Sequence, residues 1–321
     1  MYVYPSSKID RNQLGFFIHL HTIANCKALI YHFRIGIWRL ISFYSWGLMD
    51  QLTIENEVEN VQLLPAIEDD HGGVVVELKE QMDPAFFLTK LKTSMIQWTL
   101  QGKKGVWIKL PIHLVNLVEP AVKEGFCYHH AEPDYLMLVN WIPETTNTIP
   151  ANASHRVGVG AIVLNDKREI LVVQEKTGRL RGKDIWKIPT GIVEHGEDIS
   201  TGVIREVKEE TGIDTEFVEV LAFRQWHKVF FEKSDLFFVC MMRPLSFDIQ
   251  IQELEIEAAQ WMPLEELEAK PYVKKESLVS YICELTKAKV DKNYSGFSPQ
   301  PVTSFFSDEP SYIYLNKKDL N

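Results

Sequence analysis

The chain contains few cysteines and no long uninterrupted apolar run, and each shortage argues against a class of protein. Its four cysteines are widely spaced and form no Cys-x-x-Cys pair, which argues against a cysteine-based metal site and indicates reduced, buried thiols in an intracellular protein. The most apolar segment, residues 16–48, is interrupted by Lys27, Arg34 and Arg39, so we expect no membrane-spanning helix. The cysteines are Cys26, Cys127, Cys240 and Cys283.

An excess of positive charge is also lacking, because the 321 residues carry a formal net charge of −10. We therefore expect neither nucleic acid nor a membrane as a partner. Only the first 48 residues are basic, with Asp10 as their single acidic residue, and this composition permits an organelle transit peptide. An acidic stretch that begins at Met49 reads like an ordinary N-terminus. We expect residues 1–60 to be a disordered or processed extension, and the protein to be cytoplasmic unless residues 1–48 target it to an organelle.

The most informative pattern is a glycine-bracketed acidic segment over residues 191–213, which reads GIVEHGEDISTGVIREVKEETGI. Asp198 is a suitable N-cap and Gly212 is a suitable residue just past a helix end, so the segment predicts a helix over 199–211. Gly191 begins the loop before this helix, where the lack of a Cβ allows other groups to approach closely.

This helix would carry three carboxylates on one face, because Glu206, Glu209 and Glu210 are three and four residues apart. Such a cluster repels itself unless a cation is bound, and Mg²⁺ or Mn²⁺ prefers oxygen ligands of this kind. We therefore predict a divalent-cation site formed by these three glutamates and the carbonyl group of Gly191. Arg205, four residues before Glu209, is predicted to pair with that carboxylate and orient it.

The segment resembles the signature of the Nudix hydrolases, in which a glycine, five residues, a glutamate and seven residues precede Arg-Glu-U-x-Glu-Glu-x-Gly-U, with U a bulky aliphatic residue. Every specified position is filled. The resemblance implies an α/β/α sandwich with a mixed sheet, and it gives Glu197 a supporting role in holding the loop or a metal-bound water. The matching residues are Gly191, Glu197, Arg205, Glu206, Val207, Glu209, Glu210, Gly212 and Ile213.

Outside this signature, the chain resembles the plant branch of the family that cleaves ADP-ribose and NADH. The resemblance rests on segments 178–191, 221–240 and 253–266, together with the half of the chain that precedes them. It implies attack by water on a pyrophosphate phosphorus, so that ADP-ribose gives AMP and ribose 5-phosphate, and NADH gives AMP and reduced nicotinamide mononucleotide. The SQPWPF-type signature of bacterial NADH pyrophosphatases is absent, which speaks against a preference for NADH.

The proton of the attacking water must pass to a carboxylate, and Glu209 and Glu255 are both candidates. We favour Glu209, because Glu255 lies in an acidic segment where a solvated charge is equally expected. Four residues outside the signature are predicted substrate contacts, with cationic groups for phosphate and aromatic or polar groups for the nucleoside. Each could instead belong to a flexible loop or a buried strand, and the neighbouring Trp226 is expected in the core. The predicted contacts are Arg179, Arg224, His227 and Phe231.

A second, smaller domain is predicted before the hydrolase domain. Residues 61–142 resemble an acetyltransferase-like α/β fold, but the glycine-rich turn that would hold coenzyme A is missing, so acyl transfer is not expected. A linker over 143–154 leads to the hydrolase domain at 155–290, and residues 291–321 form a C-terminal tail. The chain is thus predicted to be an α/β protein, a Nudix α/β/α sandwich with a mixed sheet, preceded by the smaller acetyltransferase-like domain. Expected strands are 73–78, 105–110, 134–141, 156–164, 169–174, 218–226 and 236–242, and expected helices are 84–100, 114–124, 199–211, 264–269 and 276–288.

Three interpretations of function remain open from the sequence. The first is hydrolysis of ADP-ribose or NADH, with the small-molecule nucleotide as the partner. The second is hydrolysis of another family substrate, such as coenzyme A, capped RNA or an oxidised nucleotide. The third is a non-catalytic regulator that binds a nucleotide. A homodimer is compatible with the extra domain, which could pair between chains or pack within one chain.

Overall fold

The computed structural model describes residues 63–274, 277–303 and 311–320. The chain divides into two compact units, residues 1–150 and residues 151–321. The whole predicted N-terminal extension, residues 1–60, lies outside the described residues, and Cys26 lies within it.

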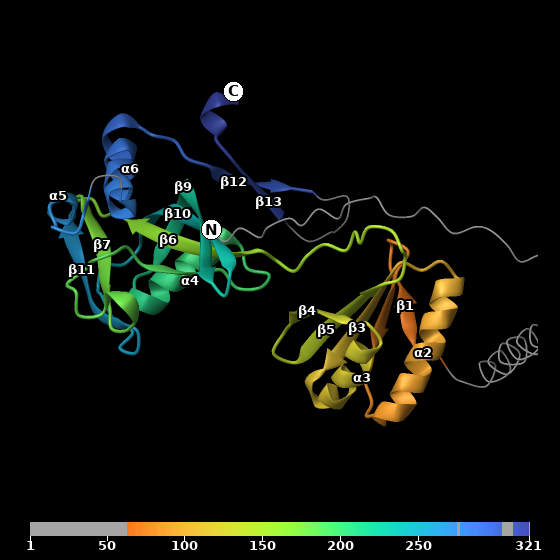
Figure 1. Cartoon of the computed structure of the whole chain (residues 1–321). Coiled ribbons are helices and arrows are strands. Elements are labelled where there is room, and N and C mark those ends of the chain that lie inside the picture. The colour runs from red at the N-terminus through yellow and green to blue at the C-terminus, as the bar shows by residue number, and fades with distance from the viewer. Residues whose placement is uncertain (1–62, 275–276, 304–310, 321) are drawn as a thin grey trace, which may run out of the picture. The chain divides into compact units, whose positions relative to one another are not determined.

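The first unit is a sheet packed against helices, and its described elements are β1 (Ala66–Glu68), β2 (Val74–Glu77), α2 (Pro84–Leu100), β3 (Gly105–Pro111), η1 (Ile112–Leu117), α3 (Val118–Lys123), β4 (Cys127–Ala131) and β5 (Tyr135–Trp141). The strand order is β1-β2-β3-β5-β4, with β2 and β3 parallel and the other neighbours antiparallel (Figure 1). Alternate residues of β3, such as Val106 and Ile108, are buried in one core cluster with Phe87 and Leu91 of α2.

The start of α2 follows from its sequence. The Asp83 carboxylate accepts hydrogen bonds from the N–H groups of Ala85 (2.9 Å) and Phe86 (3.0 Å), and Pro84 occupies the first helical position. The helix predicted over 84–100 is therefore confirmed.

One expectation for the first unit was wrong, and two of its strands were not predicted. The helix expected over 114–124 is divided into η1 and α3, because Leu114 has non-helical dihedral angles (φ −106°, ψ 23°) and Pro120 is tolerated only in the first turn of a helix. Strands β1 and β4 were not predicted. Both lie at the edges of the sheet and expose most of their residues, so they lack the apolar pattern of the central strands.

The second unit places its strands between helices, and its described elements are β6 (His155–Val163), β7 (Glu169–Glu175), η2 (Gly178–Leu180), β8 (Thr190–Ile192), α4 (Ile199–Thr211), β9 (Thr215–Phe230), β10 (Lys233–Pro244), β11 (Ile256–Pro263), α5 (Leu264–Glu268), α6 (Leu278–Lys292), β12 (Ser298–Val302), β13 (Ser311–Leu315) and η3 (Lys317–Asp319). One sheet has the order β8-β6-β10-β9, with β6 and β10 parallel and the other neighbours antiparallel (Figure 1). β7 pairs with β11 in an antiparallel sheet, and β12 pairs with β13.

Two apolar layers lie on opposite faces of β6, as the alternation of side chains along a strand requires. Val159 and Ala161 belong to the core cluster that contains Val207 of α4, whereas Ile162 belongs to the cluster that contains Ile282 of α6. Each fully buried aliphatic side chain of this kind stabilises the fold by about 1.5–3 kcal/mol. The sheet therefore lies between α4 and α6, which confirms the predicted α/β/α sandwich with a mixed sheet.

The C-terminal segment is attached to the edge of this sheet. Val220 of β9 and Phe297 exchange two backbone hydrogen bonds, of 3.0 and 2.8 Å. The buried carboxylate of Glu219 accepts a hydrogen bond from the Gly296 N–H (2.7 Å) and pairs with Lys289 of α6. A Cβ on Gly296 would lie 2.1 Å from the carbonyl oxygen of Val220, so this close approach requires glycine.

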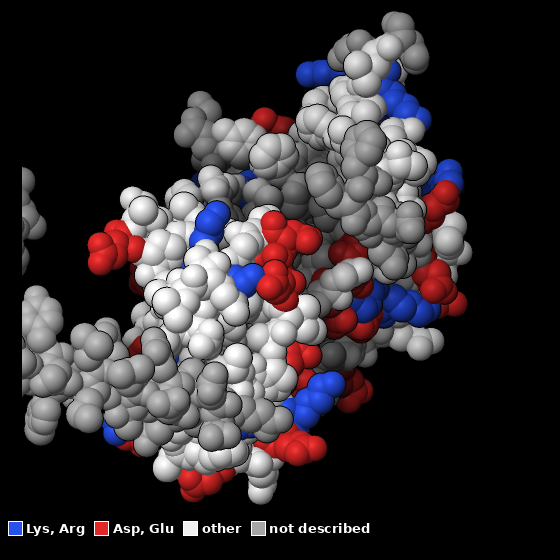
Figure 2. All heavy atoms as spheres, turned by 90° about the vertical axis from the view of Figure 1, so that its right-hand side faces the viewer, with Lys and Arg blue, Asp and Glu red and all other residues white. Residues whose placement is uncertain are grey.

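Charged side chains of both signs are interspersed on the face seen in Figure 2.

Trp226 was expected in the core, and this expectation was wrong. Trp226 is half exposed because it lies on the edge strand β9, where the guanidinium group of Arg224 lies 4.6 Å from the centre of its ring. In the part of the chain that the structure describes, no helix is long and apolar enough to cross a membrane.

Candidate active site

Strand β8 and helix α4 bring Gly191 and Glu206 into close contact. A Cβ on Gly191 would lie 1.7 Å from Cδ of Glu206 and 2.0 and 2.1 Å from its carboxylate oxygens, so any other residue would displace this side chain. Helix α4 has the predicted bounds. Gly212, with a φ of 72°, ends it and donates its N–H (2.9 Å) to the carbonyl group one turn earlier. Asp198 takes the N-cap position with extended dihedral angles, but its side chain makes no capping hydrogen bond.

Arg205 is the centre of an ion-pair network. Its Nε and Nη2 each donate a 2.9 Å hydrogen bond to Glu197, and its Nη1 donates to Glu206 (2.9 Å) and Glu209 (3.1 Å). The predicted pair with Glu209 is confirmed, but the bidentate contact is with Glu197. The hydrogen bonds from Arg205 lower the pKa of the Glu197 carboxyl. Because Nη2 also donates to the carbonyl group of Ile192 (2.9 Å), the network ties the loop to the helix.

The glutamates Glu206, Glu209 and Glu210, here called the acidic cluster, differ in exposure. Glu210 is only 8% exposed, the side chain of Glu206 is 16% exposed, and that of Glu209 is 52% exposed. Burial raises the pKa of Glu210 to about 7, although the charge of Lys187 opposes this effect, and burial also raises the pKa of Glu206. Buried carboxylates are costly to keep ionised unless a cation balances them.

One oxygen of each carboxylate in the acidic cluster is already bound. Oε1 of Glu206 accepts from the Ile192 N–H (3.1 Å) and from the guanidinium group, and Oε2 of Glu210 accepts from the Thr190 N–H (3.3 Å). Oε2 of Glu209 accepts from the guanidinium group as well. Within the described ranges, the second oxygen of each of the three carboxylates accepts no hydrogen bond.

These open oxygens determine whether the site suits a metal ion. Three carboxylates with unused oxygens, beside a glycine that leaves room, match the preference of a hard divalent cation for oxygen ligands. The side chains that the structure describes are not gathered around one point as a preformed metal site. The donor set therefore suits a divalent cation, and binding would draw the carboxylates together.

Lys187 lies beside the acidic cluster and was not singled out from the sequence. Its Nζ donates a hydrogen bond to the hydroxyl group of Thr190 (2.7 Å) and lies 3.1 Å from Oε1 of Glu175, at the end of β7. Backbone hydrogen bonds of 3.0 and 2.8 Å to Val173 hold it in place. Lys187 is thus the cation on the Glu210 side of the cluster. The sequence signal that could have identified Lys187 is its position in the segment that leads into β8.

A polar cavity of about 220 Å³ opens beside Glu175. It is formed by the end of β7, the loop after η2 and the start of β11. A hydrogen bond from Nε2 of Gln174 to Oδ1 of Asp184 (2.8 Å) joins two of its walls. Its polar lining residues are Gln174, Glu175, Arg181, Asp184 and Glu257.

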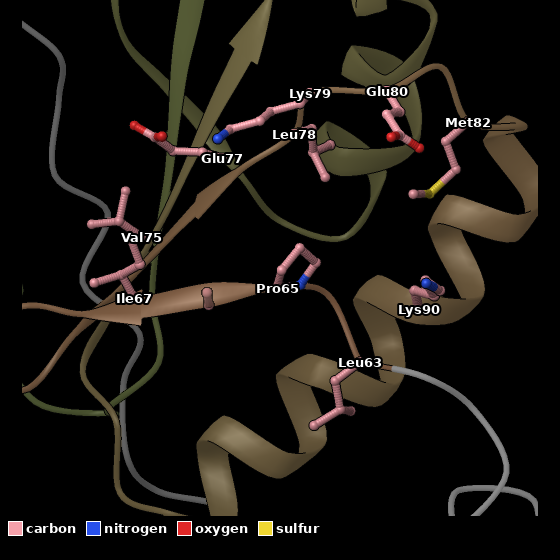
Figure 3. Close-up of a pocket in the computed structure, with 11 residues that line it drawn as sticks. Leu63, Pro65, Ile67, Val75, Glu77, Leu78, Lys79, Glu80, Met82 and Lys90 are labelled. Carbon is pink, nitrogen blue, oxygen red and sulfur yellow. The ribbon is translucent and has the colours of Figure 1, made fainter.

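The first unit contains a separate cavity of about 560 Å³, shown in Figure 3. It lies between β1, α2 and the segment after β2, and residues such as Leu63, Met82 and Lys90 line it. None of the residues that line this cavity belongs to the acidic cluster.

The predicted substrate contacts outside the signature are not brought together. Arg179 lies in η2, next to the polar cavity, whereas Arg224 lines a cavity of about 480 Å³ against α6, on the face of the sheet opposite α4. His227 shares a hydrogen bond with the Ser234 hydroxyl group (2.9 Å). Phe231 is 84% exposed in the turn between β9 and β10. The role of these four residues in substrate binding stays a prediction.

Glu255 is exposed in the turn that leads into β11. Its N–H donates to the side-chain oxygen of Gln252 (2.9 Å), and the N–H of Gln252 donates to the carbonyl group of Glu210 (3.3 Å). The N–H of Lys176 donates to the carbonyl group of Glu255 (2.8 Å). The turn therefore lies beside the C-terminal end of α4. The choice between Glu209 and Glu255 as the base stays a prediction.

The fold and the constellation around Gly191 define a hydrolase of the Nudix class, and comparison with known proteins agrees. A family model described as NUDIX domain matches residues 154–281, and one described as Nudix hydrolase domain matches residues 64–142. The chain belongs to the Nudix hydrolase family.

Its relatives include plant proteins, as the sequence resemblance predicted. Nudix hydrolase 2 of Arabidopsis thaliana is 58% identical over 259 residues, which cover 81% of this chain and 92% of that protein. Nudix hydrolase 10 of the same plant is 59% identical over 268 residues, which cover 83% and 95%. The MutT protein from Methanosarcina mazei Go1 is a solved structure with 22% identity and a TM-score of 0.35, covering 45% of this chain and 99% of that chain. The likeness of residues 61–142 to an acetyltransferase stays a prediction.

Proposed function

We propose that this protein hydrolyses the pyrophosphate bond of nucleoside diphosphate derivatives. ADP-ribose is the leading substrate and gives AMP and ribose 5-phosphate, and NADH is the second and gives AMP and reduced nicotinamide mononucleotide. The observation that carries the proposal is the acidic cluster, whose three carboxylates each keep one oxygen open beside Gly191. Hydrolases of this family generally use divalent cations, and open carboxylate oxygens are the ligands that such a cation takes when it also binds substrate phosphate.

The residues have distinct roles in this proposal. Arg205 is a positioning residue, because its guanidinium group stays protonated and holds two of the glutamates. Glu209 takes the proton of the attacking water, because its half-exposed side chain is the most accessible of the three. Glu255 is the alternative base. Bound Mg²⁺ or Mn²⁺ would polarise the phosphate oxygens and lower the pKa of a water molecule. The groups that would hold the ion are the carboxylates of Glu206, Glu209 and Glu210 and the carbonyl group of Gly191.

Product analysis by chromatography tests the proposal. The whole chain is incubated with ADP-ribose, NADH, coenzyme A or capped RNA, in Mg²⁺ or in Mn²⁺. We expect AMP from ADP-ribose and NADH, and we expect Glu210→Gln to lower turnover by roughly 100-fold or more, because it removes a charged ligand. The matched control is Glu253→Gln, which neutralises an exposed glutamate outside the cluster.

Each other outcome has a distinct meaning. Undiminished turnover by Glu210→Gln would overturn the metal-site assignment. Faster turnover of coenzyme A or capped RNA than of ADP-ribose would contradict the assignment of ADP-ribose as the leading substrate. Nucleotide binding without any turnover would favour a non-catalytic regulator.

A further inference from the structure

We propose that the polar cavity binds the hydroxyl groups of the terminal ribose of ADP-ribose, and that Glu257 is a specificity-determining residue for this sugar. The inference rests on the proposed function, because it places the second half of the same substrate.

The polar cavity is connected to the acidic cluster by direct contacts. Glu175 lines the cavity and lies 3.1 Å from Nζ of Lys187, which donates to the hydroxyl group of Thr190 (2.7 Å). The N–H of Thr190 donates in turn to Glu210 (3.3 Å). A substrate whose pyrophosphate lies at the acidic cluster therefore has one end within a few side-chain contacts of the cavity.

The lining of the cavity suits a sugar better than a base. Carboxylate and amide oxygens of Gln174, Glu175 and Glu257 accept hydrogen bonds, and the hydroxyl groups of a vicinal diol donate them. Among the described residues that line the cavity, none has an aromatic ring on which a nicotinamide or adenine could stack. Its volume of about 220 Å³ is below the ~300–1,000 Å³ of pockets for larger ligands, so it accommodates one sugar rather than a second nucleoside.

Two backbone irregularities place carboxylates at this cavity. The pairing of β11 with β7 shifts in register between Ile256 and Ala258, which leaves Glu257 as the extra residue of a bulge. Bulges redirect side chains and are frequent next to active sites. On the opposite wall, Asp184 adopts a left-handed backbone conformation (φ 52°), which a residue with a side chain seldom takes without support from its surroundings. Gln174 supplies part of that support through its hydrogen bond to Asp184 (2.8 Å).

The test compares two substrates in variants of the whole chain. One is ADP-ribose, and the other is an analogue that lacks the two hydroxyl groups at C2 and C3 of the terminal ribose. We expect the wild type to prefer ADP-ribose about tenfold or more in kcat/KM, because hydrogen bonds to a charged acceptor would be lost with the analogue. Glu257→Ala should lower kcat/KM for ADP-ribose, mainly through KM, and leave the analogue unchanged, so that the preference falls towards one.

Glu253→Ala is the matched control, because it removes an equal charge from the same acidic segment without touching the cavity. It should leave the preference unchanged. A loss of the same size for both substrates in Glu257→Ala would indicate a merely structural role and overturn the inference, as would a preference that Glu257→Ala does not change.

The failure of this inference can be distinguished from failure of the proposed function. If the wild type hydrolyses both compounds at equal rates, the proposed function is supported and the proposed ribose site is contradicted. If it hydrolyses neither, calorimetry under the same conditions decides. If ADP-ribose binds more tightly than the analogue and Glu257→Ala abolishes this difference, the assignment of the ribose site is retained. If the two compounds bind equally or not at all, both proposals are overturned.

Discussion

Replacing Gly191 with alanine should displace the carboxylate of Glu206. The added Cβ would lie 1.7 Å from Cδ of Glu206, whereas two carbon atoms in contact are separated by about 3.5–4.0 Å, so the carboxylate must move by roughly 2 Å. Gly191 is not among the glycines with a left-handed backbone, so the contact itself is the source of the strain. Forced overpacking of this kind costs about 1–3 kcal/mol of stability.

A double-mutant cycle isolates this contact. The free energy of unfolding is measured by urea titration for the wild type, Gly191→Ala, Glu206→Ala and the double variant. Gly191→Ala should cost about 1–3 kcal/mol in the wild type but less than about 0.5 kcal/mol in the Glu206→Ala background, where the displaced group is gone. An equal cost in both backgrounds would refute the reasoning. Gly105→Ala is the control, because its Cβ would meet nothing closer than 3.5 Å.

Turnover should respond more strongly than stability. A displacement of about 1 Å of a catalytic group can lower the rate about 100-fold, so Gly191→Ala should lose at least that factor in kcat while it remains folded. Full activity in Gly191→Ala would mean that the Glu206 carboxylate does not need its present position.

Two further predictions concern the charge of the acidic cluster. Because burial raises the pKa of Glu210 from its ordinary value of 4.5 to about 7, the folded state binds this proton more tightly than the unfolded state does. In EDTA the free energy of unfolding should therefore fall by about 3 kcal/mol as pH rises from about 4.5 through 7. Urea titrations at pH 5 and 8 should show most of this fall in the wild type and a clearly smaller fall in Glu210→Gln, in which Glu206 keeps its raised pKa. Equal slopes in both would contradict the assignment. In EDTA, Lys187→Met should move this fall in the free energy of unfolding to higher pH, because it removes the charge that opposes the raised pKa of Glu210. Lys167→Met, at an exposed position, should not move it. An unmoved fall in Lys187→Met would exclude this role of Lys187.

Helix α4 could be predicted to the residue because its signals are local in sequence. Asp198 and Gly212 mark its two ends, and Val203 and Val207 face the core one turn apart. Strands β8 and β11 could not be predicted in the same way. β8 has three residues and follows Pro189, and β11 begins with Ile256 in an acidic segment whose exposed glutamates hide the alternating pattern.

The contacts within the candidate site were predictable only where the two residues are neighbours on one helix. The spacing of Arg205 and Glu209 predicts their contact, because residues four apart meet on a helix. The bidentate pair with Glu197 depends on how the loop folds back onto α4, and the contact between Lys187 and Glu175 depends on the approach of two strands. A local sequence pattern predicts neither how the loop folds back onto α4 nor how the two strands approach each other.

The attachment of the C-terminal segment to β9 also has a consequence for self-association. The family model ends at residue 281, but the N–H group that binds the buried carboxylate of Glu219 comes from Gly296, and Phe297 covers the backbone of Val220. A protein cut after residue 290 would keep every residue of the candidate site, but the Glu219 carboxylate would lose its backbone donor and keep only Lys289, and the backbone groups of Val220 on the edge strand would lose their partner. We therefore expect such a truncation to increase self-association, because an unpaired strand edge can pair with other chains.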